Sequence, residues 1–202
     1  MSCIIPPIHP NPMIHNSVIA NLQSDLAGLS WLDNIYPLAG VANKNQNNSD
    51  IIIPCIYGQK QQGEHHYIEP FLDSTERSGC FFELPQGDYD FNLIDDEISF
   101  DINVVFWANL NNIADRDYDF TDELLASVLN AFVDGYYNND ITNIKTTIDR
   151  DKVFNKYGYS FKDQFSFLYP KTCFKVTISM KINNNLSCFN DGTFDASFSP
   201  VC

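Results

Sequence analysis

The chain has 202 residues, of which 44% are hydrophobic and 14% aromatic, and this composition predicts one globular domain and excludes a disordered chain. The 26 acidic and 12 basic residues give a formal net charge of −14. Because affinity for DNA depends on cations that neutralise phosphates, this charge excludes direct nucleic-acid binding as the main role.

An extended arm is predicted at residues 1–10, because prolines interrupt any helix there. The arm lacks the basic region of a secretory signal, and nowhere in the chain is an apolar run long enough to predict a membrane span. Asn11 and Pro12 then predict the start of a helix over 12–33. Its apolar residues recur at helical spacing: Ile14, Val18, Leu22, Leu26 and Leu29.

Short strands separated by polar turns are predicted next. Residues 43–50 form a polar segment that predicts a loop, and 51–57 predict a strand in which Pro54 indicates a sheet edge or a bulge. A second polar turn is expected at 58–65, followed by strands at 66–72 and 80–84.

Two long segments, 98–110 and 173–183, alternate between apolar and polar residues, which is typical of strands with one apolar face. We expect them to pair in one sheet. Between them, Asp119 or Thr121 is expected to cap a second helix over 119–137. The apolar stripe of that helix is Leu125, Val128, Leu129, Phe132 and Tyr136. A strand at 141–149 and a short helix or turn at 151–157 complete the pattern.

The fold class predicted from this order is α+β. Residues 11–183 are expected to form a single domain, with a mostly antiparallel sheet containing the two long strands and covered by two amphipathic helices. Residues 184–202 lack periodicity and are expected to form a C-terminal arm. Because apolar side chains exposed to water in a row are unfavourable, the arms either contact neighbouring subunits or fold back over their own domain. The candidate intersubunit contacts are Ile4, Ile5, Ile8, Phe189, Phe194 and Phe198.

No catalytic, cofactor-binding or metal-binding residues are predicted. The Asp115, Asp117 and Asp119 run resembles the start of a calcium loop, but Phe120 and Ala126 stand where such a loop needs Gly and Glu. The other candidate groups have simpler explanations as surface or loop residues: Glu64, His65, His66 and Glu69; the isolated His9 and His15; and Asp88, Asp90, Asp95, Asp96 and Glu97.

Cysteine spacing predicts neither a zinc site nor a disulfide framework, and reduced thiols are expected. The six cysteines are Cys3, Cys55, Cys80, Cys173, Cys188 and Cys202.

The order of the predicted elements resembles that of tail-terminator-like and neck ring proteins of tailed phages. The resemblance rests on the strand 98–110 with its Val104-Val105-Phe106-Trp107 run, the helix 121–137, and Tyr169-Pro170 before the final strand. Together with the first helix, these segments cover most of residues 11–183. The acidic, Asn- and Phe-rich composition also resembles virion proteins of crAss-like phages.

This resemblance implies a tail-terminator-like fold and a structural role in the virion neck or tail, without enzymatic activity. It implies a homo-oligomeric ring of about six or twelve copies that connects portal or head to tail around the DNA channel. The implied partners are adjacent portal, neck or tail ring proteins, with assembly in the cytoplasm of the host bacterium. DNA would pass through the lumen without specific binding, and no membrane contact is expected.

A different class of function stays open from the residues alone. The carboxylates between 88 and 97 could serve a small acidic module that hydrolyses glycans. Alternatively, the aromatic side chains of the chain could serve a module that binds glycans without hydrolysing them.

Overall fold

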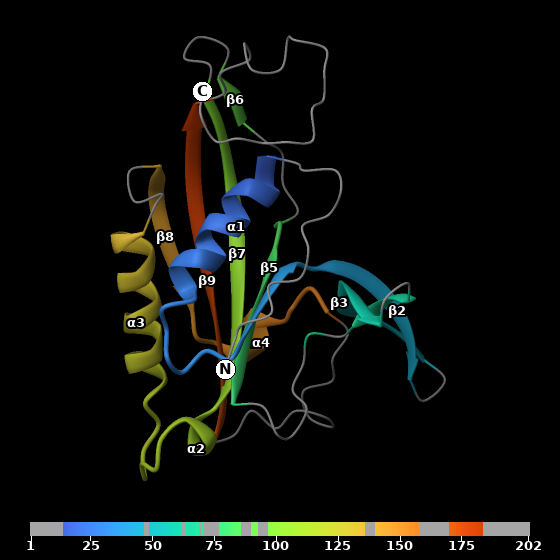
Figure 1. Ribbon diagram of the computed structural model, residues 1–202, viewed down its shortest axis with the longest axis vertical. Coiled ribbons are helices and arrows are strands. Elements are labelled where there is room, and N and C mark those ends of the chain that lie inside the picture. Colours follow the sequence, from blue (N-terminus) through green and yellow to red (C-terminus); the bar gives the residue numbers. More distant parts are fainter. Residues whose placement is uncertain are drawn as a thin grey trace.

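The computed structural model describes residues 14–46, 49–61, 64–68, 70, 77–85, 90–92, 97–135, 140–157 and 170–183. In chain order, the elements of this part (Figure 1) are α1 (Ile14–Leu26), β1 (Asn34–Leu38), β2 (Gly40–Gln46), β3 (Ser49–Gln61), β4 (Glu64–Ile68), β5 (Ser78–Glu83), β6 (Asp90–Asn92), β7 (Glu97–Asn109), α2 (Leu110–Ile113), α3 (Thr121–Asp134), β8 (Ile141–Thr147), α4 (Arg150–Val153) and β9 (Lys171–Asn183).

The main sheet is built around the two long strands, which pair antiparallel from Glu97 opposite Asn183 to Asn109 opposite Lys171. This pairing confirms the prediction for 98–110 and 173–183. Among the described residues the strand order is β1-β5-β7-β9-β8, and β6 also pairs with β7. Because β1 with β5 is the parallel pair and the other pairs are antiparallel, the α+β class with a mostly antiparallel sheet is as predicted.

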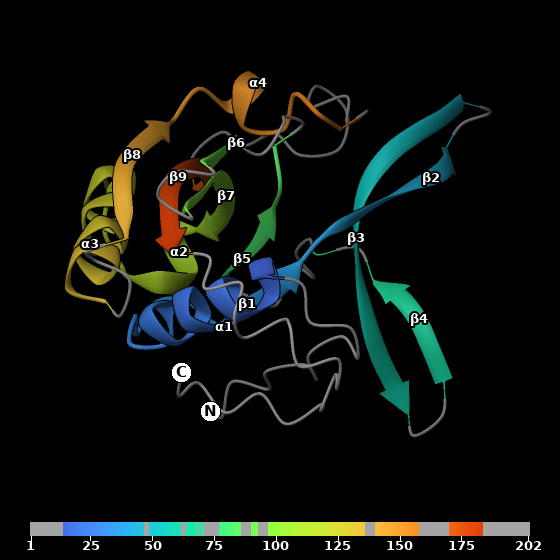
Figure 2. The ribbon, with the colours of Figure 1, turned by 90° about the horizontal axis from the view of Figure 1, so that it is seen from above.

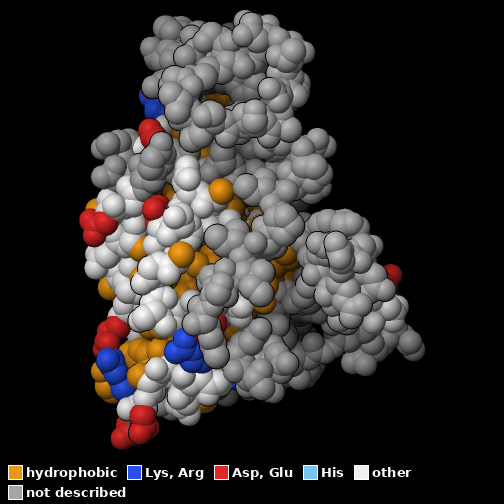
Figure 3. All heavy atoms as spheres, viewed as in Figure 1, with side chains coloured by type: hydrophobic (Ala, Val, Ile, Leu, Met, Phe, Trp, Pro, Cys, Tyr) orange, Lys and Arg blue, Asp and Glu red, His pale blue; other side chains and the backbone are white. Residues whose placement is uncertain are grey.

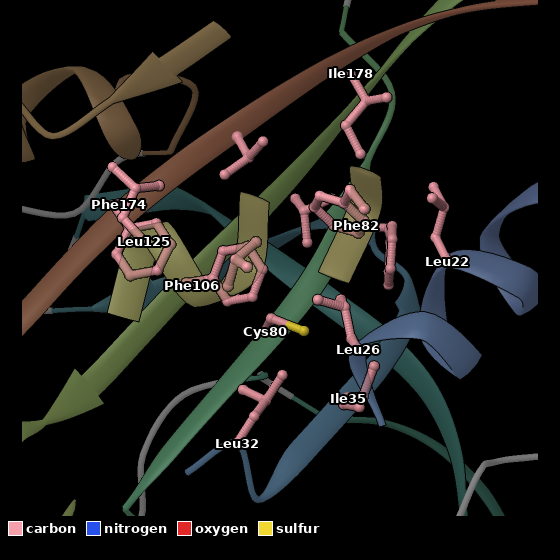
Figure 4. Close-up of a cluster of buried hydrophobic side chains, with 14 of the residues drawn as sticks. Leu22, Leu26, Leu32, Ile35, Cys80, Phe82, Phe106, Leu125, Phe174 and Ile178 are labelled. Carbon is pink, nitrogen blue, oxygen red and sulfur yellow. The ribbon is translucent and has the colours of Figure 1, made fainter. Parts of the chain in front are cut away.

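One face of the sheet carries the larger core. Phe106 and Phe174 lie opposite each other on β7 and β9, with ring centroids 4.8 Å apart. Side chains from α1 and α3 pack into the same cluster, including Leu22, Leu26 and Val128. Figure 4 shows this meeting of helix and strand side chains, with Cys80 and Phe82 of β5 between them. Burial of these side chains is the main source of stability on this face.

The opposite face is also covered, which corrects the expectation that 98–110 has one apolar face. Val105 and Trp107 are fully buried there, in a second cluster with Phe81 of β5 and Phe154 just after α4. The alternation of polar and apolar residues is weak in this part of β7, since the apolar Val105 and Trp107 occupy positions where strict alternation has polar residues. A strand covered on both faces needs apolar residues on both.

The first helix is shorter than predicted, because α1 ends at Leu26 and 34–38 is a strand. Pro37 lacks the N–H that a continuing helix would need, but it is tolerated in an edge strand. Asp33 fixes the start of β1, since its carboxylate accepts hydrogen bonds from the Arg77 backbone N–H at 3.2 Å and from the Arg77 guanidinium. This contact places β1 beside β5 in parallel register.

The polar segment 43–50 is not a loop, and 58–61 and 64–65 are not a turn. Both belong to a three-stranded sheet in the order β2-β3-β4. Its polar residues pair across the hairpin, where the Asn45 side-chain amide donates to Asp50 Oδ1 at 3.0 Å. Pro54 lies opposite Val41 of β2, and pairing with β4 starts only at Ile56. The hairpin strands β2 and β3 project away from the main sheet (Figure 2).

The remaining predicted elements agree with the structure in type. Strand 141–149 corresponds to β8, and the turn at 151–157 includes α4. Helix α3 ends at Asp134, and Tyr136 of its predicted stripe lies outside the described residues. The arms at 1–10 and 184–202 also lie outside them, and so do all six candidate contacts: Ile4, Ile5, Ile8, Phe189, Phe194 and Phe198.

Candidate functional site

A carboxylate is buried on the second face of the sheet. Glu83 at the end of β5 is 2% exposed and stands opposite Asn103 of β7, which stands opposite Thr177 of β9. The Asn103 amide donates to Glu83 Oε1 at 3.1 Å, and the Thr177 hydroxyl donates to Asn103 Oδ1 at 2.7 Å. The three side chains therefore form a polar row across the centre of the sheet.

The segment after α4 packs over this polar row and contacts Glu83. The Tyr157 hydroxyl donates to Glu83 Oε2 at 2.5 Å, and Lys156 Nζ lies 4.0 Å from the same oxygen. Burial, reinforced by the negative charge of Glu83, raises the pKa of Tyr157. Because both carboxylate oxygens are engaged by protein donors, Glu83 fits an internal anchor for 154–157 better than a general acid or base.

The Asp115, Asp117 and Asp119 run serves as the approach to α3. Phe120 occupies the N-cap position, so neither Asp119 nor Thr121 does, but Asp119 Oδ1 accepts from the Thr121 backbone N–H at 3.0 Å. Glu123 in the first turn pairs with Arg116, which lowers the pKa of Glu123. No group of three potential metal ligands exists within the described ranges.

Most of the other sequence candidates lie outside the described part of the chain. Among the carboxylates between 88 and 97, Glu97 forms an ion pair with Lys181 across β7 and β9. His65 and His66 lie on β4, and their side chains are outside the described part, as are Glu69, His9, Asp88, Asp95 and Asp96. His15 is 7% exposed with its ring edge-on to Phe100 at 5.1 Å, and burial lowers the pKa of His15.

The side chains of Cys55, Cys80 and Cys173 are buried. Cys80 belongs to the core on one face of the sheet and Cys173 to the core on the other, so the sheet separates them. Burial raises the pKa of Cys55, which disfavours the reactive thiolate. These three residues therefore pack as small apolar side chains.

A groove lies between α3 and β8, on one side of the molecule. Its volume is about 490 Å³, and α3 lines it with an aromatic ring and an exposed valine. Strand β8 lines the other side, and β8 is an edge strand of the main sheet. The lining residues are Phe132, Val133, Ile141, Thr142, Asn143 and Ile144. Val133 is 58% exposed although it is apolar.

Two exposed apolar side chains lie on the outer face of the β2–β3 hairpin. Val41 stands opposite Pro54, and Asn43 stands opposite Ile52, so Val41 and Ile52 share one face. They are 56% and 45% exposed. The other face of the hairpin carries Ile53, which packs into the second core. The hairpin therefore has an inner face that holds it to the domain and an outer face on which apolar and polar side chains are exposed to solvent.

Sequence reasoning missed these sites to different degrees. A signal for Glu83 exists, because it is the acidic end of an otherwise apolar strand, Ser78 to Glu83. The hairpin surface was hidden because its strands contain many polar residues. The groove requires α3 and β8 to be placed together, and no local pattern carries that information.

Comparisons with known proteins supply no further guide to the site. Within the described residues, no helix is both long and apolar enough to cross a membrane. No family model matches the chain, and neither a curated protein nor a solved structure matches it.

Proposed function

We propose that this chain is a ring-forming structural subunit of the neck or tail of a tailed-phage virion, connecting portal or head to tail around the DNA channel. The observation that carries the proposal is that exposed apolar side chains occur on two separate surfaces: Val133 beside the groove between α3 and β8, and Val41 and Ile52 on the β2–β3 hairpin. Helix α3 and strand β8 lie on one side of the molecule, and the hairpin lies on the other, in both views (Figures 1 and 2).

Two different surfaces on opposite sides of the molecule favour a head-to-tail contact between copies. Such a contact repeats from copy to copy, and it closes into a ring when the rotation per subunit fits. An isologous dimer would instead need a single self-complementary patch. The packing of α1 and α3 on the paired strands β7 and β9 also agrees with the tail-terminator-like layout that the sequence resembles.

The charge of the chain suits a subunit that surrounds DNA. A net charge of −14 opposes binding to phosphates, so DNA could pass a lumen lined by such subunits without sticking. On the face drawn in Figure 3, acidic side chains lie along the outer edge of α3 and at the end of the α2–α3 connection. We propose further that the arms at 1–10 and 184–202 bind neighbouring subunits or the adjacent ring.

Electron microscopy of the purified protein, alone and with the proteins encoded beside it, tests this function. Closed rings, or incorporation into a portal–tail assembly, are the expected result. Portal and capsid genes next to this gene would support the same class. Deleting 186–202 should leave a folded protein that fails to enter particles, whereas full incorporation of the truncated chain would show that this arm is not a connector.

A persistent monomer that is absent from particles would overturn the proposal. Binding of glycans by that monomer, or glycan hydrolysis lost on substituting one carboxylate between 88 and 97, would point to the alternative module. No contact among the described residues favours that alternative, since Glu97 is paired with Lys181.

A further inference from the structure

A histidine is buried where α1 begins. His15 follows Ile14, the first residue of α1, and is 7% exposed. The imidazole lies edge-on to the ring of Phe100 on β7, with ring centroids 5.1 Å apart and an interplanar angle of 85°. Phe100 belongs to the larger core. A titratable side chain therefore packs the first turn of α1 on the sheet.

The sheet around Phe100 is apolar on the face that α1 covers. Successive residues of a strand point to opposite faces, so every second residue of β7 and β9 shares the face of Phe100. Those nearest to it are Ile98, Ile102, Ile178, Met180 and Ile182. The charged residues of the same stretches lie on the other face: Glu97, Asp101 and Lys181. Among the described residues of these two strands, His15 thus meets apolar side chains.

The titratable groups of the other elements near α1 lie elsewhere. On α1 itself the acidic residue is Asp25, ten residues after His15 and about 15 Å further along the helix axis. Cys80 on β5 lies beside Leu26 at the other end of α1 (Figure 4). Tyr36 on β1 packs against the second core. The acidic residues of α3 are exposed to solvent: Asp122, Glu123 and Asp134.

Protonation of a histidine in this position is unfavourable, because an imidazolium loses its hydration among apolar side chains. Burial accordingly lowers the pKa of His15 below its ordinary value of 6.5. When the first turn of α1 leaves the sheet, the imidazole meets water and takes up a proton at its ordinary pKa. The open form therefore binds more protons than the closed form. The closed form is most stable above about pH 6.5 and loses stability as the pH falls through that value.

We propose that the start of α1 is an acid-sensitive joint, in which protonation of His15 releases the first turn of the helix from Phe100. The release is confined to this turn, because Val18, Ile19 and Leu22 stay buried in the core and carry no charge. Since the predicted arm at 1–10 precedes this turn, acid would add one helical turn to the chain between the arm and the domain. This inference goes beyond the proposed ring and does not depend on it.

Hydrogen exchange of the full-length protein at about pH 7.5 and about pH 5.5 tests the joint. Helical hydrogen bonding pairs the N–H groups of Val18 and Ile19 with the carbonyls of residues 14 and 15, so these two amides report on the first turn. This pH change raises the population of the open form by up to about 10-fold. Exchange of the two amides, corrected for its intrinsic pH dependence, should accelerate by about that factor. The amides of Val128 and Phe132 in α3 are the internal control and should not change.

Two variants and one titration complete the test. His15→Leu keeps an apolar contact with Phe100 and cannot titrate, so its two amides should stay protected at both pH values. His9→Leu is the matched control and should respond like the wild type. A nuclear magnetic resonance titration of the wild type measures the imidazole pKa directly, and a value below 6.5 is expected. A His15 imidazole that titrates at or above 6.5 would overturn the proposal. Unaccelerated exchange in the wild type, or equal acceleration in His15→Leu, would do the same.

Discussion

Truncating the Phe106 side chain at the centre of the larger core tests the packing of that core most directly. Phe106 is fully buried, stacks on Phe174 with ring centroids 4.8 Å apart and lies 6.3 Å from the Trp31 ring. Phe106→Ala removes the apolar burial and leaves a cavity, which costs roughly 3–5 kcal/mol of unfolding free energy. For a chain of this size, each kcal/mol lowers Tm by about 2–4 °C. The variant should therefore melt roughly 6–20 °C below the wild type.

Equilibrium unfolding in urea, followed by far-UV circular dichroism, measures this cost. Phe106→Leu is the matched control, because it keeps an apolar side chain of similar volume and should cost less than about 2 kcal/mol. If the slope of the unfolding free energy against urea concentration is unchanged, both variants unfold from the same fold as the wild type. A loss below about 1 kcal/mol for Phe106→Ala would mean that this face of β7 is not the core face.

Two further substitutions test the second face of the sheet. Gly79→Ala should cost about 1–3 kcal/mol of unfolding free energy in the same urea assay, because a Cβ would lie 2.5 Å from Cζ2 of the buried Trp107. The control is Gly28→Ala, which should be nearly neutral because the atom nearest to its Cβ would be 3.8 Å away. Tyr157→Phe should cost about 1–3 kcal/mol at neutral pH by leaving Glu83 short of a donor. Because the pKa of Tyr157 is raised above its ordinary value of 10.0, the unfolded chain loses this proton first. The wild type should therefore lose stability above about pH 10, more steeply than Tyr157→Phe, and equal slopes would contradict the buried hydroxyl.

The long strands could be predicted from the sequence because period-two alternation is local information. The predicted strands 98–110 and 173–183 differ from β7 and β9 by at most two residues at either end. The register that places Phe106 opposite Phe174 follows from burying the same face of both strands. Helix α3 was predictable because helical spacing is also local information: Leu125, Val128 and Phe132, spaced three and four residues apart, all pack in the core.

The errors arose where tertiary contacts decide the structure. The sequence of 34–38 has no pattern that predicts a strand. Its pairing with β5 is fixed by the contact between Asp33 and Arg77, which is distant in the sequence. The polar hairpin 40–61 was predicted in part as loops, because Asn and Gln have low strand propensity and the inner face is stabilised only by packing on the second core. The exposed face of the β2–β3 hairpin lies in one of these misassigned regions, so the sequence pattern could not locate it.

The two tryptophans of this chain lie on opposite sides of the main sheet. Trp31 Nε1 donates to Ser127 Oγ of α3 at 2.9 Å, whereas Trp107 Nε1 donates to the Pro70 carbonyl at 2.9 Å. Replacing either tryptophan by Phe leaves a single indole fluorophore, located in one layer. Emission from Trp31 then reports the loosening of the helical layer, and emission from Trp107 reports the layer beneath the hairpin. Stopped-flow traces from the two single-tryptophan proteins can thus reveal whether the layers come apart together or one after the other.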